Sequence, residues 1–207
     1  MTSLLLASAS PSRLTTLRRA GIEPLVQVSN VDEDALLDQA LLADPDLSPA
    51  DQVLILAQGK ARDVYANLGA GLAPDLIVGA DSMLEFDGQV VGKPLDSEVA
   101  RQRWRAMSGR RAALHSGHWV ITSDGKELGA TSSTIVHFAN LCDYEIDAYV
   151  RSTEPLQVAG GFTIDGLGGP FISRITGDHH GVLGLSLPLL RNLLLDLGIA
   201  WPSLWNK

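Results

Sequence analysis

Lys60 is the first residue whose position in the sequence suggests chemistry. It lies within residues 49–68, where apolar residues recur at helical spacing, and it falls on the apolar side of the expected helix. An ammonium group on an apolar stripe needs a counter-charge or an anionic ligand. The alternative is a lysine at the edge of the stripe, whose stem lies along the surface while its charge reaches water. The sequence leaves both explanations open.

Asp81 directly follows a short apolar run, residues 75–80, which we expect to form a buried strand. Ligands of α/β proteins gather beyond the carboxyl ends of strands, so a carboxylate there is well sited to hold a metal ion or a nucleophilic water. Residues 87–88 (Asp-Gly) predict a tight hairpin turn that would return Lys93 to the neighbourhood of Asp81. A carboxylate beside an ammonium suits a phosphoryl-transfer site. It equally suits a salt bridge, and Asp81 by itself could cap the next turn.

The segment from Ser8 to Arg13, with the sequence SASPSR, has the composition of a phosphate cradle. We expect a strand to end here and a helix to begin, with Ser10 as its N-cap. Free backbone N–H groups and the positive end of the helix dipole then point at one spot. The hydroxyls of Ser8 and Ser10 and the guanidinium of Arg13 would add donors. A plain capped helix explains the same serine and proline, so this motif alone does not establish a ligand site.

Glu33 lies in an acidic run, residues 32–34, of a kind that is usually solvated. Mg²⁺ in proteins is typically held by one or two carboxylates plus substrate oxygens. Glu33 and Asp81 are therefore a candidate pair for a divalent cation, Mg²⁺ or Mn²⁺, provided that the fold brings them together.

A second metal-ligand motif, GDHHG at residues 177–181, is a weaker candidate. Adjacent histidines rarely point the same way, and no matching Cys/His pair lies at structural-zinc spacing. We do not expect a zinc site there.

Short apolar runs alternate with amphipathic stretches along the chain, a pattern that favours a mixed α/β fold. Turn residues, helix caps and apolar periodicity give the expected elements. The expected strands are residues 4–7, 75–80, a hairpin at 84–86 and 89–91, a long hairpin at 114–122 and 128–138, and a glycine-rich pair within 160–175. The expected helices are residues 11–20, 48–68, 98–107, 145–151 and 186–197.

Composition narrows the class of protein. The length of 207 residues predicts one large domain or two small lobes, and we treat residues 1–207 as one unit. A formal net charge of −8 argues against nucleic acid as a partner, although an acidic enzyme can bind a polyanion through clustered cations or a divalent metal. No apolar run approaches the ~20 residues of a membrane span, and the first residues lack the basic segment of a signal peptide. We therefore expect a cytoplasmic protein without a membrane partner, and the single Cys142 excludes a disulfide within the chain.

Taken together, these segments resemble the Maf family, the so-called septum-formation inhibitor proteins, whose members are regarded as house-cleaning nucleotide pyrophosphatases. The resemblance extends along nearly the whole chain, and its strength lies in the order of the motifs. The matching segments are LLLASASPSRLTTLRRAGI, VDE as the end of the second strand, Lys60-Ala61, GADSMLEFDGQVVGKPLD, MSGR, Glu154 with VAGGFTIDG, and ITGDHHGVLGLSLPLL.

The resemblance implies a Maf/ITPase-like mixed α/β fold: an elongated mixed central sheet flanked by helices, in two lobes with the site in the cleft between them. It implies that Asp81 is the catalytic acid–base residue, that members use a divalent cation, and that they often form homodimers. Arg13, Glu33, Lys60 and Lys93 match the family's polar positions around phosphate and metal. The full set of expected substrate-binding residues is Ser8, Ser10, Ser12, Arg13, Lys60, Ser82, Lys93 and Asp165, with Glu33 and Asp81 as metal ligands.

The chain departs from the family pattern at four positions. Ala112 stands where a histidine is common, and Val158 where many members have a lysine. Ser12 replaces the usual second arginine or tryptophan, and Asp165 replaces the glutamine of many members, both at positions linked to base selection. An ionised Asp165 only accepts hydrogen bonds. We therefore expect a preference for an amino-bearing base, such as guanine or cytosine, unless Asp165 lies in a solvated turn and contacts no base.

These observations predict a metal-dependent hydrolase that cleaves canonical or modified nucleoside triphosphates to the monophosphate and pyrophosphate. The alternative is a nucleotide-binding regulator of cell division or septum formation without turnover. A pure sensor needs no carboxylates in a phosphate cleft, where they repel the ligand unless a metal intervenes. A protein–protein scaffold, the third possibility, leaves Lys60 unexplained.

Overall fold

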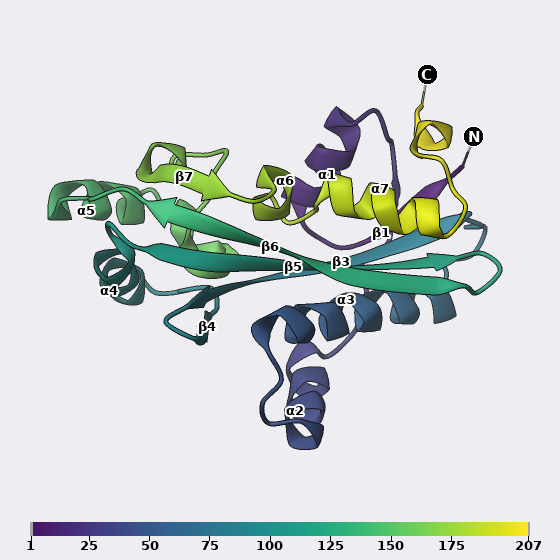
Figure 1. Cartoon of the computed structure of the whole chain (residues 1–207), viewed down its shortest axis with the longest axis horizontal. Helices are drawn as coiled ribbons and strands as arrows, with labels where there is room; N and C mark the ends of the chain where they lie inside the picture. The colour runs from purple at the N-terminus through teal and green to yellow at the C-terminus, as the bar shows by residue number, and fades with distance from the viewer. Residues whose placement is uncertain (1, 207) are drawn as a thin grey trace.

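A single mixed sheet runs through the computed structural model, which describes residues 2–206 (Figure 1). The strand order is β2-β1-β3-β5-β6-β7, and β4 pairs with β3. β1 is parallel to β2 and β3, and the other pairs are antiparallel, so the expected mixed α/β class is confirmed. The strands are β1 (Leu4–Ala7), β2 (Leu25–Val26), β3 (Leu76–Phe86), β4 (Gln89–Val91), β5 (Arg111–Thr122), β6 (Glu127–Phe138) and β7 (Ile172–Thr176).

Helices cover both faces of this elongated sheet. α3 (Pro49–Ala66) lies along one face, and α1 (Pro11–Arg19) and α7 (Leu187–Asp196) lie on the other (Figure 1). At the end of the sheet away from the chain termini are α4 (Ser97–Met107) and α5 (Asp143–Arg151), and the remaining helices are α2 (Glu33–Ala43) and α6 (His179–Val182). No helix within residues 2–206 is both long and apolar enough to cross a membrane.

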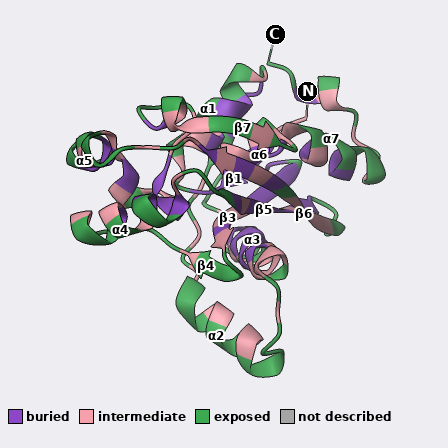
Figure 2. Ribbon diagram, turned by 60° about the vertical axis from the view of Figure 1, so that its left-hand side comes forward, coloured by how far each residue is buried: buried purple, intermediate pink, exposed green. Residues whose placement is uncertain are grey.

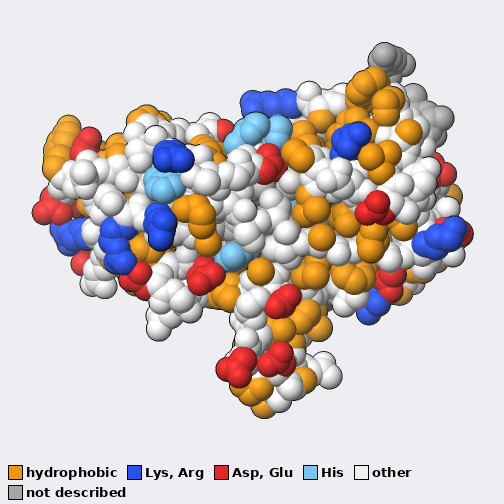
Figure 3. All heavy atoms as spheres, in the orientation of Figure 1, with side chains coloured by type: hydrophobic (Ala, Val, Ile, Leu, Met, Phe, Trp, Pro, Cys, Tyr) orange, Lys and Arg blue, Asp and Glu red, His pale blue; other side chains and the backbone are white. Residues whose placement is uncertain are grey.

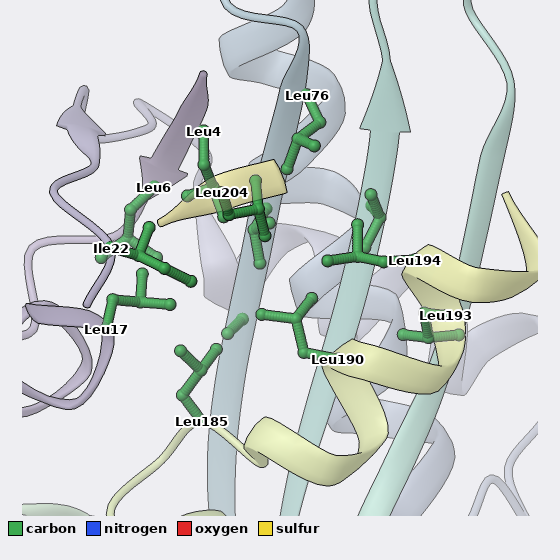
Figure 4. Close-up of a cluster of buried hydrophobic side chains, with 13 residues drawn as sticks. Leu4, Leu6, Leu17, Ile22, Leu76, Leu185, Leu190, Leu193, Leu194 and Leu204 are labelled. Carbon is green, nitrogen blue, oxygen red and sulfur yellow. The ribbon is translucent and has the colours of Figure 1, made fainter. Parts of the chain in front are cut away.

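The apolar run of β1 is buried on both sides because the strand lies between two helical layers. Leu4 and Leu6 point toward α1 and α7, where leucines of these helices complete a buried cluster (Figure 4). Leu5 and Ala7 point the other way, into a cluster with Ala61 and Val64 of α3. Alternation along one strand thus anchors helices on both faces of the sheet.

A separate buried cluster lies around Trp104 of α4, which is fully buried. Its ring makes edge-on contacts with Phe138 and Tyr149, at centroid distances of 5.4 and 5.2 Å. Its indole N–H donates to the carbonyl of Gly161 over 2.9 Å. This bond ties the loop before β7 to the helices at this end of the molecule.

Two glycines of the sheet allow α3 to approach unusually closely. A Cβ atom at Gly79 of β3 would lie 2.2 Å from the carbonyl oxygen of Ala57, and one at Gly117 of β5 would lie 2.4 Å from the carbonyl oxygen of Val53. Such contacts are sterically forbidden, so only glycine permits this packing at these positions. The close approach lowers α3 onto the strand that carries Asp81.

Most expected elements are confirmed, with three corrections. β3 does not end at residue 80 but continues to Phe86. The predicted glycine-rich pair of strands is only β7, because residues 154–171 form short 3₁₀ turns and bends. The acidic run does not end the second strand: β2 stops at Val26, and Asp32 instead caps α2, a helix that the sequence analysis missed.

α2 escaped detection because its pattern is not amphipathic. None of its residues is buried, and it stands away from the body of the molecule (Figures 1 and 2). Without an apolar stripe, periodicity gives no helix signal. Its Asp32 cap and acidic first turn were the available signs.

Candidate active site

Within residues 2–206, one edge of β3 has no strand partner between residues 80 and 83. On this edge β1 pairs with residues 76–79, and β4 pairs with residues 84–86. A cleft of about 860 Å³ opens at this gap. Its lining includes Ser8–Arg13, Glu33, Lys60, Asp81–Met83, Gly92, Lys93, Gln157–Ala159, Phe162–Asp165 and Val182–Gly184.

Asp81 therefore does not lie at the end of its own strand, as the sequence analysis assumed. It is in the middle of β3, opposite Gly117 of β5. What ends beside it is the neighbouring strand β1, which stops at Ala7. The carboxylate is still placed beyond the carboxyl end of a parallel strand, but that strand is β1.

Lys60 and two carboxylates form an ion-paired cluster on the α3 side of this gap. The Nζ atom of Lys60 lies 2.6 Å from Oδ1 of Asp81 and 2.9 Å from Oε1 of Glu33. The side chains of Lys60 and Asp81 are only 10% and 13% exposed, whereas that of Glu33 is 49% exposed. The buried lysine has its counter-charges, so the alternative of a surface lysine reaching water is wrong.

Arg13 occupies the opposite side of β3 and is almost completely buried. Its Nη1 donates to the carbonyl of Ala80 (2.7 Å) and to Oγ of Ser8 (2.9 Å), Nε donates to the carbonyl of Gly184 (2.9 Å), and Nη2 to Oγ of Ser82 (3.1 Å). Burial lowers the pKa of Arg13, against the opposing effect of the Asp81 and Glu33 carboxylates. A guanidinium nevertheless stays protonated at neutral pH. Arg13 brings a positive charge to the cleft while most of its N–H groups are bonded to the protein.

The serines of the first loop also have partners within the protein. Oγ of Ser10 accepts from the backbone N–H of Arg13, which confirms the expected N-cap of α1. Ser12 donates to the carbonyl of Leu183 over 2.9 Å, and Ser8 accepts from Arg13. These bonds fix the loop from β1 to α1 against the segment after α6.

Ser82 extends the same network across the sheet. Its Oγ lies 2.7 Å from Oγ of Ser116, which in turn donates to the carbonyl of Gly181 in α6. Neither Ser116 nor Gly184 was singled out from the sequence, because their roles depend on contacts between distant segments. No local pattern could have identified them.

Lys93 and Asp165 also line the cleft, and both are exposed. The predicted hairpin between β3 and β4 is confirmed and returns Lys93 to the cleft. The ion-pair partner of Asp81, however, is Lys60 and not Lys93. Asp165 lies in a bend and faces both the cleft and an adjoining pocket of about 420 Å³.

Glu154 holds the loop that carries Asp165. Its carboxylate accepts from the hydroxyls of Tyr149 and Thr163 and from the backbone N–H groups of Leu167 and Gly168. Burial raises the pKa of Glu154, but these hydrogen bonds outweigh it, so the pKa lies below its ordinary value. The glutamate quoted in the family motif thus positions a loop at the edge of the cleft.

The donor set of the cleft suits a hard divalent cation. Glu33 and Asp81 offer only oxygen atoms, and both carboxylates converge on the same ammonium group. Two carboxylates plus substrate oxygens are what Mg²⁺ and Mn²⁺ typically require. The structure therefore brings together the pair expected from the sequence, with Lys60 between them.

The sequence of this chain is similar to those of several known proteins. A family model described as Maf-like protein matches residues 3–197. A protein of Nocardia farcinica named nucleoside triphosphate pyrophosphatase is 51% identical, over 100% of this chain and 98% of its own length. A protein of the same name from Leifsonia xyli subsp. xyli is 50% identical, over 99% of this chain and 97% of its own.

Solved structures give weaker likenesses. The Staphylococcus aureus Ham1 protein matches with a TM-score of 0.44 and 14% identity, over 95% of this chain and 100% of that one. A Mycobacterium abscessus structure described as a nucleoside-triphosphatase, or dITP/XTP pyrophosphatase, matches with a TM-score of 0.39 and 20% identity, over 68% of this chain and 76% of that one. At such scores no functional conclusion rests on either structure.

Proposed function

This chain belongs to the Maf-like protein family, and from that premise we propose that its cleft hydrolyses nucleoside triphosphates to the nucleoside monophosphate and pyrophosphate. Relatives that are 50% and 51% identical, over nearly their whole length, carry the name of that activity. The observation that supports it most in this chain is the cluster of Lys60, Asp81 and Glu33 at the unpaired edge of β3. The substrates would include modified nucleotides that must be removed from the pool.

In the proposed mechanism Asp81 orients the attacking water or accepts its proton. Water attacks the α-phosphorus, the bond between this phosphorus and the oxygen bridging to the β-phosphate breaks, and pyrophosphate leaves with that oxygen. Lys60 and Lys93 neutralise phosphate charge. Arg13 adds a fixed positive charge and holds the loop from Ser8 to Ser12 in place.

A divalent cation, Mg²⁺ or Mn²⁺, would be held by Glu33 and Asp81. When bound, it would supply the charge that lets carboxylates face a polyphosphate and would polarise phosphate oxygens. Lys60 already lies between the two carboxylates. Before substrate binds, its ammonium group would offset the electrostatic repulsion between these two carboxylates.

Asp165 is proposed as the residue that selects the base. It lines both the cleft and the smaller pocket. A carboxylate there accepts hydrogen bonds and offers none. It would favour bases with amino groups, such as guanine or cytosine, over thymine and uracil.

The rival function is a nucleotide-binding regulator of cell division without turnover. The mostly buried Asp81 counts against it, because a site built only to bind triphosphate gains nothing from a carboxylate facing the phosphates. Cytoplasmic location, a homodimer and the absence of nucleic-acid or membrane partners also belong to the proposal. The net charge of −8 supports the exclusion of nucleic acid.

The decisive experiment measures pyrophosphate and monophosphate release from a panel of canonical and modified nucleoside triphosphates. We expect equimolar monophosphate and pyrophosphate with Mg²⁺ or Mn²⁺, loss of activity in excess EDTA, and its return when the metal is restored. Turnover that persists in EDTA would contradict the metal-dependent mechanism. Tight nucleotide binding without product would favour the regulator.

A further inference from the structure

A second group of metal-ligating side chains lies outside the carboxylate pair. Asp178, His179 and His180 each offer one ligand atom, and these three atoms lie within 4.8 Å of one another. The two imidazole rings are stacked at a centroid distance of 3.8 Å with a tilt of 38°. The adjacent histidines therefore do point the same way, which removes one of the two reasons given from sequence against a metal site. Histidine side chains gather at the upper edge of Figure 3, where Figure 1 draws α6.

The carboxylate of Asp178 is fixed in place. Its two oxygens accept from the backbone N–H groups of His180 (3.2 Å) and Gly181 (3.0 Å). The backbone of Asp178 exchanges two hydrogen bonds with the hydroxyl of Thr134 on β6, at 3.0 and 3.1 Å. The hydroxyl of Ser186 also bonds to this carboxylate, and of its roughly four lone-pair sites at least one is left for a metal ion. Outer hydrogen bonds of this kind are what orient a ligating carboxylate.

One histidine nitrogen in this group lacks a partner. Among the side chains that the structure describes, Nδ1 of His180 is buried and makes no hydrogen bond. It lies 3.5 Å from Oδ1 of Asp178, while Nδ1 of His179 lies 4.0 Å from the same oxygen. Ligand atoms around a tetrahedral zinc ion, with bonds of about 2.1 Å, are separated by roughly 3.4 Å. The His179 side chain is 64% exposed, and a small rotation would bring its Nδ1 to the separation that tetrahedral zinc requires.

We propose that Asp178, His179 and His180 bind a divalent transition metal of the zinc type. Two imidazoles and one carboxylate suit Zn²⁺, Co²⁺ or Ni²⁺ better than Mg²⁺, which prefers oxygen ligands. Three protein ligands leave one tetrahedral position open. Both histidines line the 420 Å³ pocket that also contains Asp165, so the open position faces the proposed base-binding end of the cleft. This site is separate from the carboxylate pair of the hydrolytic mechanism.

The site is linked mechanically to the cleft. α6 follows Asp178 directly, and the carbonyls just after it accept from Ser12 and from Nε of Arg13. A metal bound at the start of α6 would therefore stabilise the segment that holds the Ser8–Arg13 loop. Since the ion binds the folded state, it should raise the melting temperature by mass action.

The test uses the whole protein carrying Cys142→Ser, freed of metal, so that the lone thiol does not contribute a ligand. It is titrated with Co²⁺ while visible absorption is recorded, and Zn²⁺ is then added in competition. We expect one equivalent of Co²⁺ with the intense bands of tetrahedral coordination, displaced by Zn²⁺. A stabilising shift of the melting temperature should follow Zn²⁺ but not equimolar Mg²⁺.

Three variants assign the ligands. His179→Ala removes an exposed side chain, and Asp178→Asn keeps an oxygen that can cap α6 while removing the carboxylate, so both should fold. Each should weaken Zn²⁺ binding by at least about tenfold. His137→Ala, an imidazole of β6 outside the cluster, is the matched control and should bind as wild type. Absence of saturable binding, or binding unchanged in His179→Ala and Asp178→Asn, would overturn the proposal, whatever the outcome of the hydrolysis assay with Mg²⁺.

Discussion

The two faces of β3 treat their buried cations in opposite ways. Asp81 and Ser82 are neighbours on the strand, and their side chains point to opposite faces. On the α3 face, Lys60 is neutralised by the carboxylates of Asp81 and Glu33. On the α1 face, Arg13 is surrounded by neutral oxygens, among them those of Ser82 and Gly184.

These different surroundings indicate different roles for Lys60 and Arg13, both of which the sequence analysis had expected to bind substrate. Under the proposed mechanism, a divalent cation would replace Lys60 as the counter-ion of the carboxylates, and the ammonium group would then be free to pair with phosphate. The Nη1 and Nε donors of Arg13 cannot turn to a ligand without breaking bonds to the carbonyls of Ala80 and Gly184, and an unsatisfied buried carbonyl costs about 1–3 kcal/mol. Nη2, whose partner is the hydroxyl of Ser82, does not carry that cost. Arg13 thus holds the loop from β1 to α1 and the segment after α6 in place, and in the proposed mechanism the residues on the α3 face carry the chemistry.

Asp81→Asn should give the largest effect. It preserves shape but removes the proton acceptor and a metal ligand, so kcat should fall by about 10²–10⁴-fold. Nucleotide binding, measured by calorimetry without turnover, should persist. Ser82→Ala, one residue along the strand on the other face, is the matched control and should lose less than about tenfold. Equal losses for the two variants would mean that the faces do not differ in chemistry.

Lys60→Met should give the next largest effect, and this effect is mainly on the free energy of unfolding. Removing the cation leaves the nearly buried Asp81 carboxylate without its partner, which should destabilise the fold by about 3 kcal/mol, near the lower end for a broken buried ion pair. Adding Asp81→Asn should restore part of this loss, because the uncompensated charge is gone. The free energies of unfolding are obtained from urea titrations.

On the other face of β3, adding Asp81→Asn to Arg13→Met should restore no stability. Arg13→Met leaves the carbonyls of Ala80 and Gly184 unsatisfied, and Asp81→Asn does nothing for them, so the two losses should add. Rescue of Arg13→Met by Asp81→Asn, or no rescue of Lys60→Met, would remove the contrast between the faces.

Asp165→Gln should have the smallest effect and should change selectivity rather than rate. A glutamine amide both donates and accepts, so it can pair with the mixed edge of thymine or uracil. Because Asp165 is exposed, we expect the ratio of kcat/KM for dTTP over dGTP to rise by about tenfold, or about 1.4 kcal/mol. Steady-state kinetics with both nucleotides measure it. A ratio that does not change would mean that Asp165 contacts no base.

Much of the fold could be read from local patterns. The cap at Ser10, the apolar stripe that places Lys60 inward and the turn at Asp87-Gly88 each depend on residues a few positions apart. Such signals are set by backbone geometry and by burial of one side of an element, both of which act over short stretches. Local patterns did not reveal helix α2, because none of its residues is buried and it therefore has no apolar stripe.

The sequence by itself determined the family, the mixed α/β class and the set of polar residues that gather in the cleft. Only the tertiary structure decided how they are used. Lys60 meets Asp81 because two glycines let α3 sink onto the sheet, and Ser12 and Arg13 are bonded to a segment 171 residues away. The stacked rings of His179 and His180 likewise follow Asp178, whose backbone is bonded to Thr134 of β6. Partners this distant in the chain are chosen by packing of the whole fold, and no short-range pattern encodes them.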